Sequence, residues 1–232
     1  ALAAALAVPA WAGTEAPDAE AAAWLQRVAD ASRKLPYEGI FVMQMGDSMK
    51  TIQVENHAGG GSNTSRLLVL DGQQREIRCY RNESVTLVWD AKGKRLERRL
   101  GTRHFPDLLP ENTVRLNDNY TVRLGGPDRV AGLECRTLEL LPRDRFRWGY
   151  VLCADQATGL PLKAAMVDAE GRPLVQYTFT SVRKGVTGKT ETAPPGVSPA
   201  DEIRPMETGA IAVNLLPPGF VKEVAIKRKL PN

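Results

Sequence analysis

From Gly39 to Val182 the sequence is a series of short runs in which apolar and polar residues alternate. Alternation with a period of two is typical of β-strands with one buried face, and short links rich in Gly and Asp favour antiparallel hairpins. Strand-like runs cover residues 39–45, 49–55, 66–70, 75–80, 84–89, 120–124, 133–141, 149–153, 162–167 and 174–182. The expected turns lie at residues 46–47, 71–72, 91–93, 125–127, 159–161 and 170–171. The pattern predicts about ten or eleven strands in a long antiparallel meander.

A helical period precedes the strands. Between residues 18 and 35 apolar side chains recur at spacings of three and four, at Ala21, Trp24, Leu25, Val28, Ala31 and Leu35. This spacing places them on one stripe of a helix that begins near Pro17 and ends before Pro36. Because the stripe must be buried against the sheet, we expect a mainly β fold with one N-terminal helix. The predicted architecture is an open antiparallel half-barrel around that helix.

We expect this domain to span residues 18–184. Within it, residues 102–112 lack periodicity and contain Pro106 and Pro110, which predicts a lid or rim loop. Residues 185–212 are rich in Pro, Thr and Gly and predict a semi-extended linker. Residues 213–232 begin a new apolar pattern but are too few to form a core. We interpret them as the truncated start of a second domain.

Residues 1–12, ALAAALAVPAWA, are small and apolar and end in the A-x-A pattern that signal peptidases cleave. We interpret them as the remnant of a signal peptide, with a mature protein that begins near Gly13 or Thr14 and is exported from the cytoplasm. The alternative is an Ala-rich soluble helix, although Pro9 interrupts the run. No later apolar run reaches the ~20 residues of a membrane-spanning helix.

The sequence has three cysteines, Cys79, Cys135 and Cys153. In an oxidising compartment two of them can form a disulfide. If a three-residue loop, residues 143–145, joins the strands on either side, Cys135 and Cys153 face each other within disulfide reach. A two-residue loop would instead place Cys135 opposite Leu152. We therefore predict a Cys135–Cys153 disulfide, with three buried thiols as the alternative.

The sequence offers no candidate for catalysis, a metal site or a cofactor. Its two histidines, His57 and His104, lie at no metal-ligand spacing, and the carboxylates are scattered beside Arg or Lys. Residues 59–62, Gly-Gly-Gly-Ser, lack the GK[ST] ending of a phosphate loop and predict a hairpin loop. The net charge of +4 is too mild to indicate nucleic acid as a partner. These features exclude the common enzyme classes and favour a binding protein.

The most unusual charge feature is the basic stretch from Lys92 to Arg103, to which residues 143–147 add three more arginines. One interpretation is a solvated basic strand and turn. The other is a surface that docks acidic ligands, such as a lipid phosphate or an acidic peptide, because Arg grips phosphate and carboxylate well. The residues of that predicted surface are Arg95, Arg98, Arg99 and Arg103.

Five stretches in order resemble one family. They are residues 24–42 (WLQRVADASRKLPYEGIFV), 70–76 (LDGQQRE), 129–152 (RVAGLECRTLELLPRDRFRWGYVL), 155–180 (DQATGLPLKAAMVDAEGRPLVQYTFT) and 216–220 (LPPGF). They are similar to the MucB/RseB family, periplasmic negative regulators of the envelope-stress sigma factor in Gram-negative bacteria. No single stretch is a fingerprint, but their order and spacing together are specific. The departure is at the C-terminus, where the family's smaller domain is represented only by residues 215–232, so this fragment is expected to bind its partner less tightly.

The resemblance implies a domain like the lipoprotein carriers LolA and LolB. It also implies a periplasmic protein that caps the periplasmic region of a membrane anti-sigma factor, RseA or MucA, shields it from the site-one protease, and is released by lipopolysaccharide or lipoprotein acyl chains. On this reading a concave apolar face with Phe41, Met43, Met45 and Leu68 would hold acyl chains, and the alternative is that these residues are ordinary core against Trp24 and Leu25. A lipid or lipoprotein carrier of LolA type is the second functional hypothesis. A homo-oligomeric state stays open.

Overall fold

The computed structural model describes residues 19–59, 62–73, 75–80, 83–90, 93–100, 103–186, 215–218 and 220. These residues form one antiparallel sheet of eleven strands and two helices, α1 (Ala19–Lys34) and the short 3₁₀ helix η1 (Val114–Asp118). The strands are β1 (Tyr37–Met45), β2 (Ser48–Gly59), β3 (Ser62–Val69), β4 (Arg75–Tyr80), β5 (Glu83–Asp90), β6 (Gly93–Leu100), β7 (Tyr120–Val130), β8 (Leu133–Pro142), β9 (Gly149–Asp155), β10 (Pro161–Val167) and β11 (Pro173–Lys184). The predicted fold class is confirmed. The predicted signal peptide, nearly all of the predicted linker and most of residues 213–232 lie outside the described residues.

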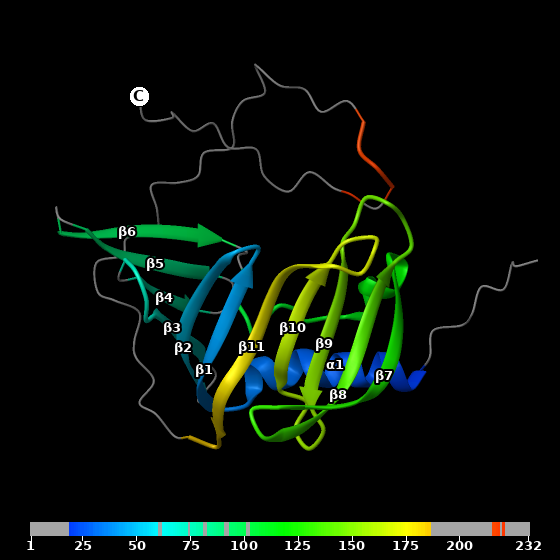
Figure 1. Ribbon diagram of the computed structural model, residues 1–232, viewed down its shortest axis with the longest axis horizontal. Coiled ribbons are helices and arrows are strands. Elements are labelled where there is room, and N and C mark those ends of the chain that lie inside the picture. Colours follow the sequence, from blue (N-terminus) through cyan, green and yellow to red (C-terminus); the bar gives the residue numbers. More distant parts are fainter. Residues whose placement is uncertain are drawn as a thin grey trace, which may run out of the picture.

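The order of the strands in the sheet differs from their order in the chain at two places. The order is β6-β5-β4-β3-β2-β1-β11-β10-β9-β8-β7, so β1 lies in the middle. From β1 the chain runs outward to β6 at one edge, and the next strand, β7, lies at the opposite edge (Figure 1). It then returns inward to β11, which pairs with β1. The connection between β6 and β7 must therefore pass from one edge of the sheet to the other.

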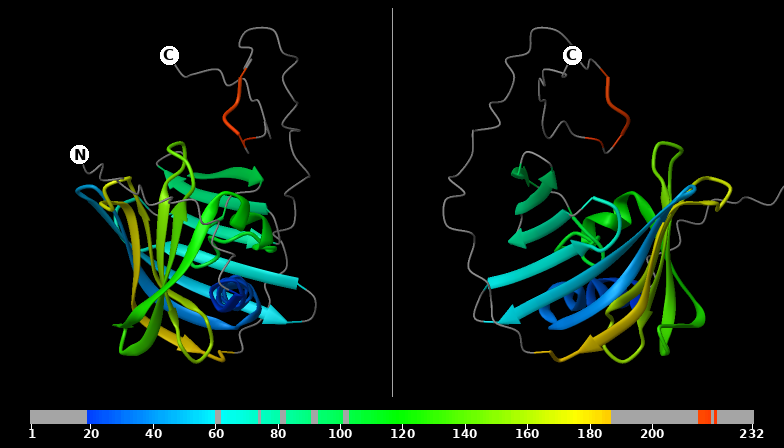
Figure 2. Two further views of the ribbon diagram at one scale, coloured as in Figure 1. Left: turned by 90° about the vertical axis from the view of Figure 1, so that its right-hand side faces the viewer. Right: turned by 60° about the vertical axis from the view of Figure 1, so that its left-hand side comes forward.

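Figure 2 shows that the sheet is strongly curved and that α1 lies on its concave side. Four residues of the predicted stripe, Ala21, Leu25, Val28 and Ala31, are buried, with Leu25 and Val28 at 1% and 0% exposed. The other two, Trp24 and Leu35, are partly buried, and Leu35 follows the end of the helix. At one end, Glu20 forms an ion pair with Arg136 of β8, whose N···O distance is 2.6 Å. The turn between β9 and β10 also approaches the helix closely, because a Cβ on Gly159 would lie 3.1 Å from Cγ of Arg27. No helix in the described part of the chain is long and apolar enough to cross a membrane.

The turn predicted at residues 125–127 is wrong. These residues lie inside β7, where the pairing with β8 shifts register between Leu124 and Pro127. A Cβ on Gly125 would lie 3.0 Å from Cβ of Thr137 on β8, so the glycine permits close approach of the two strands. Gly and Pro mark β-bulges as well as turns, which is why the local pattern suggested a chain reversal here.

Cys135 and Cys153 form a disulfide, with their Cα atoms 5.5 Å apart. The register from which this pair was predicted is nevertheless wrong by two residues. In the sheet Cys135 is opposite Asp155, and Cys153 is opposite Thr137, so the bridge joins diagonal neighbours. The reason is that β8 ends at Pro142 and β9 begins at Gly149, which leaves a six-residue connection in place of the expected three.

Candidate functional site

The connection from β6 to β7 crosses the concave face of the half-barrel. We call residues 103–113 the crossing segment. Residues 102–112 were predicted to be a lid or rim loop, but Phe105 and Leu109 are buried, at 2% and 8% exposed. The Phe105 ring stacks on Tyr177 of β11 with a centroid distance of 5.2 Å, and it meets Phe41 of β1 edge-on at 4.9 Å. Together with Phe179, these rings fill the middle of the concave face.

Two polar side chains of α1 hold the crossing segment in place. Gln26 accepts hydrogen bonds from the backbone N–H and the hydroxyl of Thr113, at 3.1 and 2.8 Å, and donates one to the carbonyl of Glu111 at 3.0 Å. Two turns further along, Arg33 forms an ion pair with Asp107 at 2.7 Å and donates to the carbonyl of Leu109. Neither residue stands out in the sequence, although their spacing of seven places both on one face of the helix.

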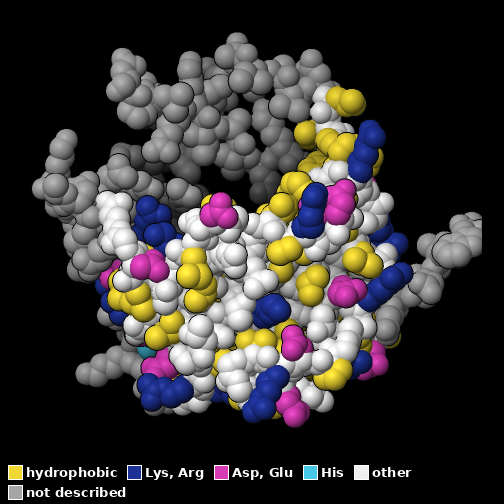
Figure 3. All heavy atoms as spheres, viewed as in Figure 1, with side chains coloured by type: hydrophobic (Ala, Val, Ile, Leu, Met, Phe, Trp, Pro, Cys, Tyr) yellow, Lys and Arg dark blue, Asp and Glu magenta, His cyan; other side chains and the backbone are white. Residues whose placement is uncertain are grey.

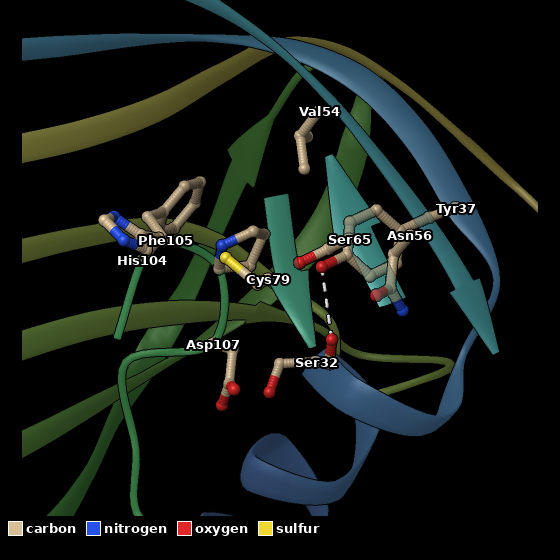
Figure 4. Close-up of a pocket in the computed structure, with 10 residues that line it drawn as sticks. Ser32, Tyr37, Val54, Asn56, Ser65, Cys79, His104, Phe105 and Asp107 are labelled. Atoms are coloured by element: carbon tan, nitrogen blue, oxygen red, sulfur yellow. Dashed lines mark hydrogen bonds between the residues drawn. The ribbon is translucent and has the colours of Figure 1, made fainter. Parts of the chain in front are cut away.

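A small cavity remains beside the crossing segment (Figure 4). Its lining comes from α1, β1 to β4 and the crossing segment, and consists of Ser32, Tyr37, Val54, Asn56, Ser65, Cys79, His104, Phe105, Pro106 and Asp107. Its volume is about 30 Å³. A water molecule needs about 10–15 Å³ on this measure, so the cavity has room for water and not for an acyl chain.

The side chains that line this cavity include three whose pKa is raised by burial: Tyr37, Cys79 and Asp107. The Tyr37 hydroxyl donates a hydrogen bond to the carbonyl of Ser32 at 3.1 Å, and burial raises the pKa of Tyr37 well above its usual range. Burial also raises the pKa of the Cys79 thiol to about 11. Burial raises the pKa of Asp107, although the charges of Arg33 and Arg103 oppose the shift. A thiol with so high a pKa is a poor nucleophile at neutral pH.

The four residues predicted to line an acyl-chain pocket do not come together in one. Phe41 is 1% exposed within the aromatic cluster, and Met43 packs against the core. Met45 is 55% exposed at the end of β1. Leu68 lies between Leu67 and Val69, which both contact the core, so the alternation of β3 directs Leu68 to the convex face.

The predicted acidic-ligand surface is described only in part. Arg95, Arg98 and Arg99 lie in the edge strand β6, opposite Val88, Val85 and Ser84 of β5. Their side chains lie outside the described residues. Arg103 lies 3.5 Å from Asp107 and so belongs to the polar contacts of the crossing segment.

A second candidate surface lies at the connection between β8 and β9. We call residues 143–148 the hairpin tip. Asp144 accepts a hydrogen bond from the backbone N–H of Phe146 at 2.9 Å and forms an ion pair with Arg147. Arg143 donates to the carbonyl of Asn117 at 3.1 Å, which holds η1 beside the tip. Phe146 and Trp148 are each 49% exposed.

The chain returns to the hairpin tip after the predicted linker. The Arg147 guanidinium lies 4.2 Å from the ring centroid of Phe220, and it donates a hydrogen bond to the carbonyl of Pro218 at 3.3 Å. These contacts leave the Arg147 side chain only 9% exposed. In Figure 1 this is where the orange segment meets the top of the hairpin.

Comparison with known proteins identifies the family. The model of the MucB/RseB N-terminal domain matches residues 20–197. The sigma factor AlgU regulatory protein MucB of Pseudomonas aeruginosa is 30% identical over 232 residues, which cover 97% of this chain and 70% of that protein. The solved complex of Pseudomonas aeruginosa MucA and MucB matches with 29% identity and a TM-score of 0.61, over 74% of this chain and 59% of that one.

A solved structure of MucB in complex with MucA(peri) matches with 29% identity and a TM-score of 0.60. The match covers 73% of this chain and 57% of that chain. The chain thus spans somewhat more than half the length of the MucB chains in these complexes. Because the family model covers well over half of the sequence, the chain belongs to the MucB/RseB family.

Proposed function

We propose that this protein is a periplasmic regulator that binds the periplasmic region of a membrane anti-sigma factor of the MucA/RseA type. The observation that carries the proposal is its similarity, at 29% identity, to MucB chains solved together with MucA. Binding of this kind regulates a sigma factor indirectly, because the anti-sigma factor holds the sigma factor inactive. The proposed role is binding and involves no chemical reaction.

The finer mechanism is a linkage between two ligands. Bound to the anti-sigma factor, the protein would shield it from the site-one protease. Lipopolysaccharide or a lipoprotein acyl chain that binds only the free protein would lower the fraction available for shielding. A ligand of this kind shifts the equilibrium only as far as its affinities for the two states differ.

Among the described residues the middle of the concave face is filled, which supports a regulator over the alternative, a lipid or lipoprotein carrier. A carrier needs a cavity that accepts an acyl chain, whereas here Phe41, Phe105 and Tyr177 occupy the middle of the concave face. The cavity beside them, of about 30 Å³, holds water-sized molecules only. Lipid binding in the middle of the concave face would therefore require the crossing segment to move.

A binding and protection experiment tests the proposal. The chain is titrated by calorimetry with the purified periplasmic region of the MucA-type anti-sigma factor from the same organism, with and without lipopolysaccharide. The site-one protease is then added, and cleavage of the anti-sigma region is followed over time. We expect saturable binding, slower cleavage, and loss of both with lipopolysaccharide. Absence of binding, together with acyl chains in an organic extract of the purified protein, would favour the carrier.

A further inference from the structure

The hairpin tip carries exposed aromatic rings and arginines side by side. Phe146 and Trp148 are each half-exposed, and Phe220 is 38% exposed where it rests on Arg147. The Arg145 guanidinium lies 5.3 Å from the Phe146 ring centroid. We call Arg143, Arg145, Phe146, Trp148 and Phe220 the tip surface. In Figure 3, hydrophobic and basic side chains meet at the upper right, where Figure 1 shows the hairpin tip.

The charges of the tip surface are uneven. Asp144 is paired with Arg147, whose guanidinium is covered by Phe220. Arg143 and Arg145 are exposed, and among the described residues neither forms an ion pair with a carboxylate. A ligand that complements this surface therefore carries apolar side chains for the rings and carboxylates for the two arginines.

The structure also indicates that the surface accepts polypeptide. A segment of this chain already rests on it, with the Pro218 carbonyl accepting a hydrogen bond from Arg147 and the Phe220 ring against the same guanidinium. The Phe220 N–H also donates to the carbonyl of Pro217 at 3.1 Å, so this segment contacts the surface as a turn. Residues 221–232, which follow this segment, are a poor candidate for the exposed part, because they carry four basic residues and one acidic residue. Their charge would repel Arg143 and Arg145.

We propose that the tip surface is a docking site for an acidic and apolar segment in the periplasmic region of the anti-sigma factor. This inference rests on the proposed function and adds the location and chemistry of one contact. Aromatic side chains and arginines are the residue types that most often dominate binding energy at protein interfaces. The partner segment would lie on the tip surface beside Pro218 and Phe220 and would contact the exposed rings and the two arginines.

Charge reversal tests the proposal. Arg143→Glu with Arg145→Glu is compared with Arg75→Glu and Arg129→Glu, which change the net charge equally at exposed positions on β4 and at the far end of β7. Binding of the periplasmic region is measured by calorimetry. We expect the tip variant to raise Kd by about tenfold or more and the control variant by less than about twofold. Equal thermal unfolding midpoints show that both variants are folded.

Removal of the rings gives an independent test. Phe146→Ala with Trp148→Ala is compared with Met45→Ala and Met49→Ala, two exposed apolar residues at the β1–β2 turn. Loss of affinity of about tenfold in the aromatic variant alone supports the tip surface. Hydrogen exchange of wild-type protein should show protection of residues 143–148 when the periplasmic region is added.

The possible failures are distinguishable. If wild-type protein does not bind the periplasmic region at all, the proposed function and this docking site are both rejected. If it binds and the tip variants bind equally well, the docking site alone is rejected. A third result is that the charge-reversal variant of Arg143 and Arg145 loses the wild-type protein's binding to phosphatidylglycerol vesicles while it still binds the periplasmic region normally. That result would show that the arginines bind lipid and would overturn the inference. A dimer in sedimentation that only the tip variants lose, again with partner binding unchanged, would overturn it as well.

Discussion

The guanidinium of Arg33 lies 2.7 Å from the carboxylate of Asp107, and this ion pair joins α1 to the crossing segment. The two side chains are 14% and 32% exposed, so both are largely withdrawn from water. Arg33 also donates hydrogen bonds to the carbonyl of Ala29 in its own helix and to that of Leu109. One side chain thus joins the end of the helix to the crossing segment, and its partner Asp107 lines the cavity.

Replacement of Arg33 by Met should lower the free energy of unfolding by about 1–3 kcal/mol, because it leaves the Asp107 carboxylate and the Leu109 carbonyl without their shared donor. Urea denaturation measures the loss. Lys34→Met is the matched control, since Lys34 pairs with Asp30 at the surface and is 72% exposed. Its effect should stay within about 0.5 kcal/mol. Equal losses in the two variants would contradict the role given to Arg33.

The disulfide predicts a simple thiol count. In unreduced, denatured protein one thiol per chain, that of Cys79, should react with an alkylating reagent, and three should react after reduction. The variant Cys135→Ala with Cys153→Ala should lose about 3 kcal/mol of stability, because the closed loop constrains the unfolded chain. Cys79→Ala is the control and should lose less. Three reactive thiols without reductant would rule out the bridge.

Alternation along the chain predicted the strands and the helix well, because burial of one face is a local property of each segment. It did not predict where the crossing segment lies. Residues 102–112 look like a surface loop, since Pro106 and Pro110 prevent regular pairing. Only the strand order, with β6 and β7 at opposite edges, forces this connection across the concave face. Strand order depends on contacts between distant segments, which no local pattern contains.

The same limit applies to the candidate sites. The alternation of β1 predicts that Phe41 faces the concave side, but it contains no sign that Phe105 of the crossing segment packs against it. The predicted register of the β8–β9 hairpin is wrong because the loop has six residues, not three. Asp144 holds this longer loop through a hydrogen bond from the Phe146 N–H and an ion pair with Arg147. Gln26 and Arg33 carry no such signal in the sequence, because polar residues on a helix usually face solvent.

Acid should weaken the fold through Glu76. This carboxylate is 6% exposed and accepts hydrogen bonds from Arg66 at 3.0 Å and Arg78 at 2.6 Å. Burial acts to raise its pKa, but the hydrogen bonds and charges of the two arginines outweigh burial and lower it. The resulting stability is present above the pKa of Glu76 in the unfolded chain and is lost as the pH falls through the lower pKa of the folded state.

Glu76→Gln should therefore be less stable than wild type at pH 7, and the difference should shrink as the pH is lowered below about 4.5. Urea denaturation at a series of pH values measures it. The control is Glu170→Gln, in the exposed turn between β10 and β11, where the side chain is 65% exposed. A difference between Glu76→Gln and wild type that stays constant with pH would show that the Glu76 charge does not contribute.

Truncation of Phe105 should be the most damaging single change in the crossing segment. Its ring lies within 5.3 Å, between centroids, of Phe41, Tyr177 and Phe179, and none of the other connections between strands supplies a ring to this described cluster. Phe105→Ala should lower the free energy of unfolding by about 3–5 kcal/mol, because it removes the ring and leaves a cavity at the centre of the concave face. Phe146→Ala, at the half-exposed hairpin tip, is the matched control and should cost less than about 1 kcal/mol. If Phe105→Ala lowers the free energy of unfolding by less than about 1 kcal/mol, the crossing segment must move to fill the cavity. The packing of the concave face would then be less rigid than the ring contacts indicate.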